Sequence, residues 1–344
     1  MDYFFAQAEE KRRPEIAGKV VLVCVFSGRT SDSGVISTVN YRGRALGIKS
    51  GMPIINAKKL AYGVDAIFLP VDHEYYGDIS SKIDMMIRKK CSRVVQMSVD
   101  EWNIEEDDAT AEEKALSIKA EIVMRFGLSS SVGIAPSLLG AKMAAGKGKP
   151  NGFVVLTKTS EKKMIDESDV EKIPGIGGKS TKVLEEIGVK KVKDLAGSDP
   201  VQLIEVFGKK GGAWLVALGK GEYNEKLGEE KEQEGISRIR TLKEMTRDER
   251  EILSKLFELE TEAKEHLALI KKAYRTLSII FITEDMGTHT KSMTFRNPKT
   301  WNEEIRKEEK ELVAKFLEEN GLQIRRIGIR FGGFMDFASQ TTLF

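Results

Sequence analysis

The stretch Val94-Val95-Gln96-Met97-Ser98-Val99-Asp100-Glu101 sets the expectations for both fold and site. Its first six residues are mostly β-branched or apolar, which predicts a strand. Two carboxylates follow at the end of that strand, where a backbone turn lets both approach one divalent ion. Oxygen ligands of this kind suit Mg²⁺ or Mn²⁺. Taken alone, the acidic dipeptide is as typical of a solvated turn as of a metal site.

Strands and helices lie on both sides of this stretch. The apolar run Lys19–Phe26 predicts a buried strand, and the first ten residues have the pattern of a helix. The other expected elements are helices within 39–60 (broken at Gly51-Met52-Pro53), over 74–90 and over 110–126, and a strand at 129–134. This mixture predicts an α+β core.

The composition limits the class of protein. At 344 residues the chain is too long for one ordinary core, so two to four domains are expected. No apolar run reaches membrane-spanning length, and the acidic start differs from a secretory signal. Cys24 and Cys91 lie far apart without a CxxC motif, so they suggest neither a disulfide framework nor a zinc site, and a reducing cytoplasm fits. The net charge of +2 is nearly balanced, so local charge arrangement matters more.

The C-terminal half predicts two further units. Residues 157–225 have the pattern of short helices with Gly-rich turns, and 225–235 are almost wholly polar, as in a linker. A βαββαβ unit is expected next, with strands at 236–242, 274–284, 288–296 and 323–332 and helices at 246–268 and 301–319. Its helices are expected on one side of the sheet.

Charge in this last unit is sorted by element. The helices contain most of the acids, whereas the predicted strands contain five arginines and no acid: Arg238, Arg240, Arg325, Arg326 and Arg330. Residues two apart share a sheet face, which pairs Arg238 with Arg240, and the same reasoning pairs Arg326 with Arg330. One open, basic face suited to a phosphate backbone is therefore expected, although a merely solvated face explains the pattern equally well.

Ile173-Pro174-Gly175-Ile176-Gly177-Gly178-Lys179-Ser180 is the clearest sign of DNA binding. It predicts a helix-hairpin-helix turn, in which Gly175 and Gly177 let backbone amides approach a phosphate at a helix N-terminus. Lys179 and Lys182 add positive charge. The segment Phe207–Ala213 resembles a degenerate second copy. Such hairpins bind the backbone without reading bases, so they predict non-specific binding.

A third group of residues could bind a polyphosphate. Tyr41 and Arg44 are three apart, on one face of a predicted helix, and Lys149-Pro150-Asn151-Gly152 lies further on. A guanidinium and an ammonium can share one polyphosphate. A solvated arginine helix is the alternative.

Together these segments resemble the Y-family, or translesion, DNA polymerases, closest to the archaeal DNA polymerase IV type. The matching stretches are Asp2–Gln7, Val23–Arg29, Asp32–Gly34, Asn40-Tyr41, Gly51–Ile54, Ser98–Glu101, Val132–Pro136, Lys149–Gly152, Pro174–Gly177 and Ile324–Gly328. They span essentially the whole chain. The resemblance implies a right-hand polymerase with a C-terminal little-finger domain. It implies these divisions: palm 1–10 and 70–156, fingers 11–69, thumb 157–225, linker 226–235, little finger 236–336 and tail 337–344.

The resemblance also implies a site and a reaction. Asp100 would bind both catalytic Mg²⁺ ions, with Mn²⁺ as a substitute, and Glu101 the ion that activates the primer 3′-hydroxyl. Thr38, Tyr41, Arg44 and Lys149 would bind the incoming triphosphate, with Phe4 and Phe5 beside the nucleotide. Phe5 falls at the steric gate that excludes a 2′-hydroxyl. The implied reaction is templated two-metal nucleotidyl transfer in DNA repair, with an open site that accepts damaged bases.

The implied partners are primer-template DNA and deoxynucleoside triphosphates, bound by a monomer in the cytoplasm. Gln340–Phe344 resembles the front of a sliding-clamp-binding peptide, and an unstructured polar tail is the alternative.

The resemblance breaks at the N-terminus. The family's third carboxylate comes from a strand ending in Asp-x-Asp; Asp2 matches the second acid, and the first would precede Met1. Either Met1 is an internal residue of that strand, or the chain is a non-catalytic relative that binds DNA. A hairpin-containing nuclease or glycosylase is disfavoured, because no Lys or Asp at the usual distance after the hairpin completes a glycosylase pattern.

Overall fold

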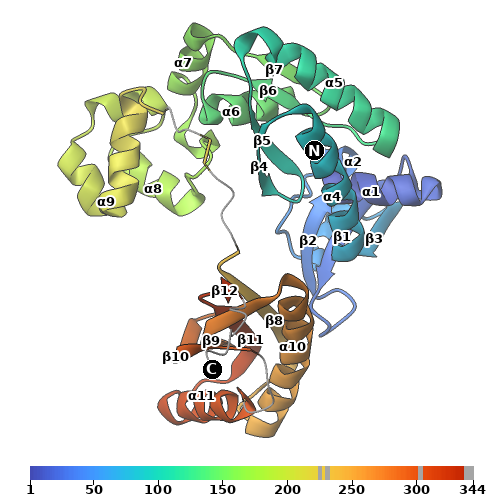
Figure 1. The fold of residues 1–344 in the computed structure, drawn as a ribbon, viewed down its shortest axis with the longest axis vertical. Helices are drawn as coiled ribbons and strands as arrows, with labels where there is room; N and C mark the ends of the chain where they lie inside the picture. The colour runs from blue at the N-terminus through green and yellow to red at the C-terminus, as the bar shows by residue number, and fades with distance from the viewer. Residues whose placement is uncertain (224–226, 229–232, 301–304, 337–344) are drawn as a thin grey trace, which may run out of the picture. The chain divides into compact units, whose positions relative to one another are not determined.

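The computed structural model describes residues 1–223, 227–228, 233–300 and 305–336 (Figure 1). The chain divides into two compact units. The first comprises Met1–Val23, Ser37–Lys49 and Ala61–Glu230, and the second comprises Cys24–Ile36, Ser50–Leu60 and Lys231–Phe344. Within the described ranges, no helix is both long and apolar enough to cross a membrane.

The N-terminal elements surround the predicted buried strand. These elements are α1 (Phe4–Arg12), β1 (Val20–Phe26), β2 (Gly34–Val39), α2 (Tyr41–Ala45), α3 (Ile54–Leu60) and β3 (Ala66–Pro70). Strand β1 is the central strand of a sheet of order β2-β1-β3, which explains its continuous apolar run. The predicted break in the helical segment is confirmed, because residues 46–53 separate α2 from α3.

A second group of elements presents the acidic dipeptide. It comprises α4 (His73–Lys90), β4 (Arg93–Ser98), β5 (Glu101–Glu105), α5 (Asp108–Phe126), β6 (Val132–Ile134), α6 (Leu138–Gly148) and β7 (Phe153–Val155). Strands β4 and β5 form an antiparallel hairpin, and β6 pairs with β7 in parallel. Side chains of α1, α4, β4 and α5 share one apolar core, including Phe4, Ile83, Val94 and Ile118.

Residues 157–223 are helical, as predicted. They form α7 (Lys158–Asp166), α8 (Gly178–Glu186) and α9 (Pro200–Gly219), with 3₁₀ turns at Val170–Lys172 and Val192–Gly197. A separate apolar core joins them, including Ile165, Leu184 and Leu215. Helix α9 is kinked at Gly208, whose φ of 74° lies outside the helical region.

The predicted βαββαβ unit is confirmed. It comprises β8 (Gly235–Thr246), α10 (Glu249–Ile270), β9 (Lys272–Thr283), β10 (Thr288–Lys299), α11 (Ile305–Glu319), β11 (Ile324–Gly332) and the short β12 (Met335–Asp336). The sheet order is β10-β9-β11-β8, and every pairing is antiparallel.

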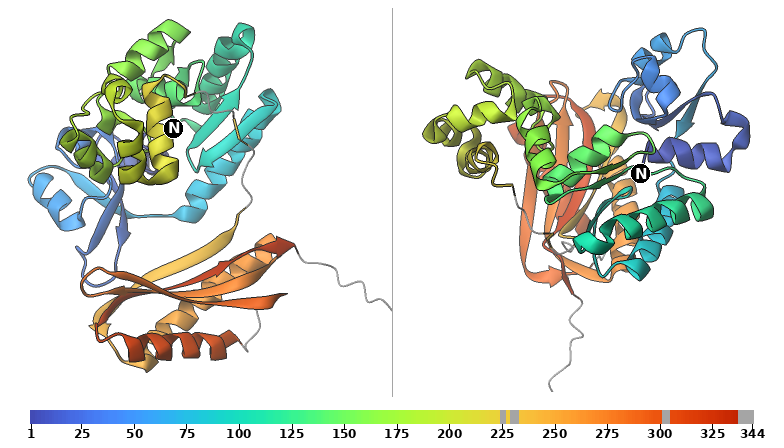
Figure 2. Two further views of the ribbon diagram at one scale, coloured as in Figure 1. Left: turned by 90° about the vertical axis from the view of Figure 1, so that its left-hand side faces the viewer. Right: turned by 90° about the horizontal axis from the view of Figure 1, so that it is seen from above.

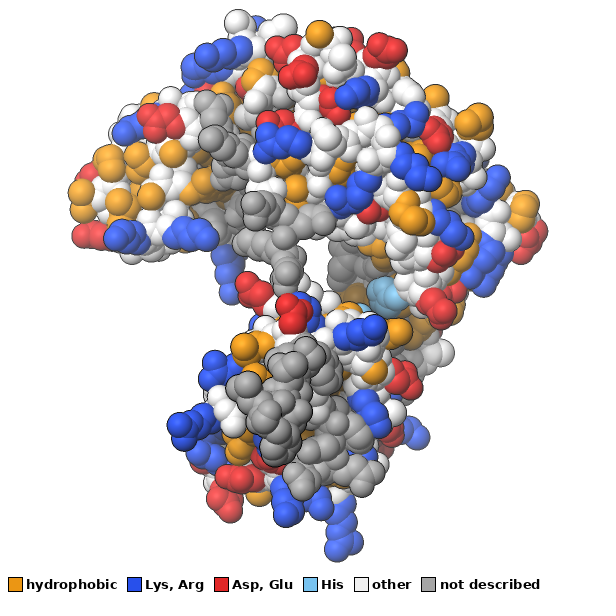
Figure 3. Space-filling model, in the orientation of Figure 1, with side chains coloured by type: hydrophobic (Ala, Val, Ile, Leu, Met, Phe, Trp, Pro, Cys, Tyr) orange, Lys and Arg blue, Asp and Glu red, His pale blue; other side chains and the backbone are white. Residues whose placement is uncertain are grey.

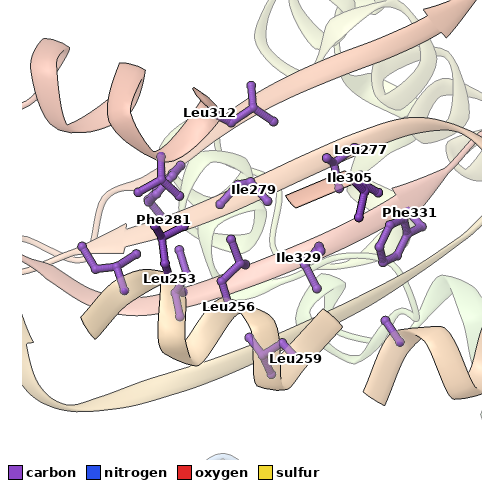
Figure 4. Packing of buried hydrophobic residues seen from close by; sticks show 14 of the residues in the cluster. Leu253, Leu256, Leu259, Leu277, Ile279, Phe281, Ile305, Leu312, Ile329 and Phe331 are labelled. Atoms are coloured by element: carbon purple, nitrogen blue, oxygen red, sulfur yellow. The ribbon is translucent and has the colours of Figure 1, made fainter. Parts of the chain in front are cut away.

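Both helices of this unit cover the same face of the sheet (Figure 2). The core between them contains Leu256 from α10, Leu312 from α11, and Phe281 and Ile329 from the sheet (Figure 4). The rings of Phe281 and Phe316 stack with centroids 4.0 Å apart. No helix in the described part of this unit covers the opposite face of the sheet.

Candidate active site

Asp100 and Glu101 lie at the turn of the β4–β5 hairpin. Glu101 is the first residue of β5 and pairs across the hairpin with Ser98, beside a register shift that tightens the turn. The Ser98 hydroxyl donates to Asp100 Oδ1 over 2.9 Å. Both carboxylates are partly exposed. The turn that the sequence predicted therefore brings two acids to one place.

Positively charged groups gather around this turn. Lys142 of α6 forms an ion pair with Glu101, with Nζ 2.6 Å from Oε1. Lys149 Nζ donates to the Met1 carbonyl oxygen over 3.3 Å, and the Met1 amine donates to the Asp100 carbonyl oxygen over 2.5 Å. Burial lowers the pKa of that amine. Of these three groups, Lys142 is the one that contacts a carboxylate, and the other two donate to backbone carbonyl oxygens.

The donor set fits a hard divalent ion, although it contains two carboxylates and not three. Carboxylate oxygens are the ligands that Mg²⁺ prefers, and the Lys142 ammonium stands in for a cation at Glu101. Among the described residues, no group of three His, Cys, Asp or Glu side chains could bind a metal. The Asp2 carboxylate does not complete the set, because it is fully buried and accepts hydrogen bonds from Ser129, Ser131 and Asn151.

The predicted triphosphate residues Tyr41 and Arg44 lie together on α2. The Asn40 side chain caps this short helix by accepting from the Gly43 amide over 3.1 Å. The Arg44 guanidinium lies over the Tyr41 ring, 4.8 Å from its centroid. Burial raises the pKa of Tyr41. Its hydroxyl is buried and has no hydrogen-bond partner among the described residues, so it is available to a ligand. Thr38 lies near the end of β2 and is partly exposed.

Phe4 and Phe5 occupy different environments on α1. Phe4 is only 2% exposed and packs in the core, so any contact it makes with a nucleotide would be through its backbone. Phe5 is partly exposed and stacks on Tyr76, with ring centroids 4.3 Å apart. The Tyr76 hydroxyl in turn donates to the buried Glu9 over 2.8 Å. Tyr76 and Glu9 thus fix the Phe5 ring, a role that the sequence did not indicate.

The hairpin of residues 173–182 has the geometry that its glycines predict. Gly175 has a φ of +99°, and Gly177 is the N-cap of α8. Lys179 and Lys182 are exposed on the first turns of that helix. In the proposed second copy, only Gly208 departs from helical geometry.

The five arginines of the last unit do not share one face, so that expectation is wrong. Arg238 and Arg240 lie at even-numbered positions of β8, as do Ile236 and Leu242, which are buried against the helices. Because alternate residues of a strand share a face, both arginines lie on the helix side of β8. Arg240 pairs there with Glu258 and Glu262 of α10.

The uncovered face has a groove of its own. Arg330 lines a shallow hollow of about 310 Å³ with the hydroxyl groups of Thr276, Ser278, Thr290 and Ser292. Arg326 lies on the same face as Arg330, four residues earlier on β11, and Arg325 lies at the register shift that begins this strand. Strand β8 also extends to Thr246 and so includes Glu244, an acid that the shorter predicted strand did not contain.

Lys142 was missed by sequence reasoning. No local pattern links it to Glu101, from which it lies 41 residues away in sequence. The predicted clamp-binding segment Gln340–Phe344 lies outside the described residues.

Comparisons with known proteins cover the whole chain. Residues 1–146 match the model of the impB/mucB/samB family, and residues 233–343 match that of the family's C-terminal domain. DNA polymerase IV of Methanosarcina acetivorans is 38% identical, with 100% of this chain and 97% of that protein covered. DNA polymerase IV of Saccharolobus solfataricus is 34% identical, with 97% and 95% covered.

Solved structures agree with the sequence comparisons. A Y-family DNA polymerase chimera has a TM-score of 0.89 at 31% identity, and 97% of both chains is covered. The insertion ternary complex of Dbh DNA polymerase has a TM-score of 0.70 at 32% identity, again with 97% of both chains covered.

Proposed function

The chain belongs to the impB/mucB/samB family of Y-family DNA polymerases, and from this premise we propose that Asp100 and Glu101 bind its catalytic divalent ions. It is a DNA-directed DNA polymerase of the DNA polymerase IV type, a translesion enzyme and a nucleotidyltransferase. The observation that supports the site is the β4–β5 turn, which brings two carboxylates together and at which Lys142 pairs with Glu101.

Y-family polymerases use divalent metal ions, and we assign two Mg²⁺ ions here, with Mn²⁺ as a substitute. When bound, such ions lower the pKa of the primer 3′-hydroxyl and neutralise charge on the triphosphate. Asp100 and Glu101 supply the protein oxygen ligands. Lys142 must release Glu101 for that purpose, and its ammonium is then available to a phosphate oxygen.

The incoming deoxynucleoside triphosphate is assigned to Tyr41, Arg44 and Lys149, with Thr38 beside them. The Arg44 guanidinium and the Lys149 ammonium supply charge. The Tyr41 hydroxyl, which no described residue hydrogen-bonds, supplies a hydrogen bond. Phe5 is the proposed steric gate. Its stacking on Tyr76 keeps the Phe5 ring from moving aside to make room for a 2′-hydroxyl.

Primer-template DNA is assigned to the helical unit and to the uncovered sheet face. The amides at the start of α8 and the cations Lys179 and Lys182 suit a phosphate backbone. Arg330 and the hydroxyl-lined groove suit a second stretch of backbone. We assign the palm, fingers, thumb and little finger the boundaries that the sequence resemblance implies. A monomeric enzyme in the cytoplasm that binds the sliding clamp through Gln340–Phe344 completes the proposal.

Substitution of Asp100 tests the metal site. We expect Asp100→Ala to reduce Mg²⁺-dependent primer extension by about 100-fold or more, because a charge-stabilising ligand is lost. Glu105→Ala is the matched control: this acid lies at the other end of the same hairpin, paired with Arg93. Its activity should remain near that of the unsubstituted enzyme. Extension that survives Asp100→Ala would refute the assignment. An unsubstituted chain that binds primer-template but extends nothing with Mg²⁺ or Mn²⁺ would instead favour the non-catalytic alternative.

A further inference from the structure

The Asp2 side chain is a buried carboxylate with a complete set of polar partners. It is 0% exposed. Ser131 Oγ donates to Oδ1 over 2.8 Å, and Ser129 Oγ donates to Oδ2 over 3.1 Å. The backbone amide of Asn151 donates to Oδ2 over 2.7 Å. A buried charge is costly unless it is hydrogen-bonded, so this set of donors makes Asp2 a fixed point of the structure.

Lys119 of α5 also binds the loop that contains Asn151. Lys119 Nζ donates to Asn151 Oδ1 over 2.5 Å, to the Asn151 carbonyl oxygen over 3.0 Å, and to the Ser130 carbonyl oxygen. Burial lowers the pKa of Lys119, whereas the charge of Asp2 raises it. Asp2 and Lys119 thus attract one another and bind both ends of the Asn151 residue.

Gln7 ties α1 into this arrangement. Its Oε1 accepts from the Ser129 amide over 2.7 Å, and its Nε2 donates to the Ser129 carbonyl oxygen over 3.2 Å and to the Asp2 carbonyl oxygen. The amide side chain therefore pairs with the backbone of residue 129 as a neighbouring strand would. Chain segments that are more than 100 residues apart in sequence are joined by these bonds.

The loop that Asp2 and Lys119 bind also carries Lys149. This lysine lies two residues before Asn151, and its ammonium is exposed and reaches the Met1 carbonyl oxygen beside Asp100. We infer that Asp2 and Lys119 are positioning residues for the nucleotide: they fix the loop at Asn151 and thereby aim Lys149 at the incoming triphosphate. The inference rests on the proposed role of Lys149 in triphosphate binding. Neither Asp2 nor Lys119 needs to touch the nucleotide.

Steady-state kinetics of single-nucleotide insertion tests the inference. Asp2→Asn keeps the shape of the side chain but removes its charge and one acceptor. We expect the KM for the nucleotide to rise about tenfold while kcat changes less than about threefold, because misplaced binding groups weaken ground-state and transition-state binding alike. Lys119→Met should raise KM in the same way. The Kd for primer-template should stay within about twofold of the original in both variants, because the DNA contacts are elsewhere.

Lys114→Met is the matched control for Lys119→Met. Lys114 lies on the same helix and also forms an ion pair, but with Glu106 and away from the loop. Its loss should leave KM unchanged. If Asp2→Asn fails to fold, Lys119→Met still tests the inference, because its side chain is only partly buried.

A double-mutant cycle with Lys149→Ala separates positioning from general damage. If Asp2 acts through Lys149, Asp2→Asn should add less than about twofold to KM in the Lys149→Ala background. Additive effects, or a loss confined to kcat, would overturn the inference. If Lys149→Ala itself leaves KM unchanged, the proposed triphosphate role fails. If Lys149→Ala raises KM but Asp2→Asn and Lys119→Met do not, the positioning role alone fails.

Discussion

Glu309 of α11 is a carboxyl group whose surroundings oppose its charge. It is 0% exposed, and neither of its oxygens has a hydrogen-bond partner among the described residues. Burial, and then the neighbouring Glu260 of α10, raise the pKa of Glu309 to about 9. Arg306 lowers it in part, but that guanidinium is bound to Glu260, with Nε 3.1 Å from Oε2.

Other charged and titratable groups close to this pair do not change the direction. Glu308 on the same helix raises the pKa of Glu309 further and is itself bound to Lys299 of β10. Burial, and then the same carboxyls, raise the pKa of the Tyr274 hydroxyl of β9. Glu309 is therefore protonated in the folded protein at neutral pH.

Stability of the C-terminal unit should consequently fall as pH rises. The pKa in the folded state exceeds the ordinary value of 4.5, so the folded state binds the proton more tightly. The stabilisation is complete below the ordinary pKa and is lost progressively as pH rises towards 9. Glu309→Gln should remove this dependence and stabilise the unit by on the order of 1–4 kcal/mol at pH 7.5. Hydrogen exchange of α10 and α11 in the full chain, between pH 5 and 9, measures it. Equal protection of both proteins at high pH would contradict the prediction.

At the scale of elements, the start of α8 carries the proposed contact with a DNA phosphate. Gly175 and Gly188 lie before and after this helix, with φ of +99° and +85°. A Cβ at Gly175 would meet only Trp214 at 3.7 Å, and a Cβ at Gly188 would meet nothing within 4 Å. Both positions therefore suffer similar backbone strain on substitution by alanine, of about 1–2 kcal/mol.

The two glycines differ in position relative to the amides that would bind DNA. Gly175→Ala should weaken primer-template binding by about tenfold, because strain displaces the N–H groups at the helix start. Gly188 lies at the other end of α8. Gly188→Ala should leave primer-template binding unchanged while lowering thermal stability as much as Gly175→Ala does. Fluorescence anisotropy with labelled primer-template compares them. Equal losses in both variants would mean that the hairpin affects DNA binding only through stability.

The sequence predicted most elements because their patterns are local. A few consecutive residues are enough to predict the buried strand β1, the amphipathic helix α4 and the Gly-rich turn at 173–178. The predicted orientation of Arg238 and Arg240 on β8 was wrong, because it did not take the apolar residues of the same strand into account. Both arginines share a face with Ile236 and Leu242, which point to the core. The alternation of side chains along a strand shows which residues share a face, and only the buried residues among them show whether that face points to the core.

The Asp2 arrangement could not be predicted from one sequence. Its bonds join Asp2 to residues 127, 129 and 149 positions away. No periodicity links partners at such distances, and their pairing depends on how α1, α5 and β6 pack. In contrast, the acidic turn at residues 100–101 was predictable, because a strand pattern and two acids are adjacent.

At the scale of the whole molecule, net charge explains little of the expected DNA binding. The 55 basic and 53 acidic residues leave +2, and Figure 3 shows blue and red side chains interspersed over the visible face. Affinity for a phosphate backbone must then come from the few cations that no acid neutralises. Of the strand arginines, Arg330 is exposed on the uncovered sheet face, whereas Arg240 is paired with two glutamates.

These two arginines provide a matched pair, because both are exposed and both lie on neighbouring strands of one sheet. Arg330→Gln should weaken primer-template binding and reduce the magnitude of the negative slope of log K against log salt by about 0.9, the value for one released counterion. Arg240→Gln removes a cation that already neutralises Glu258 and Glu262, so it should leave the slope unchanged. Binding measured at four salt concentrations for each variant gives both slopes. If Arg240→Gln reduces the magnitude of the slope as much as Arg330→Gln does, the helix-side arginine exchanges its glutamates for phosphate when DNA binds, and both faces of the sheet contribute to affinity.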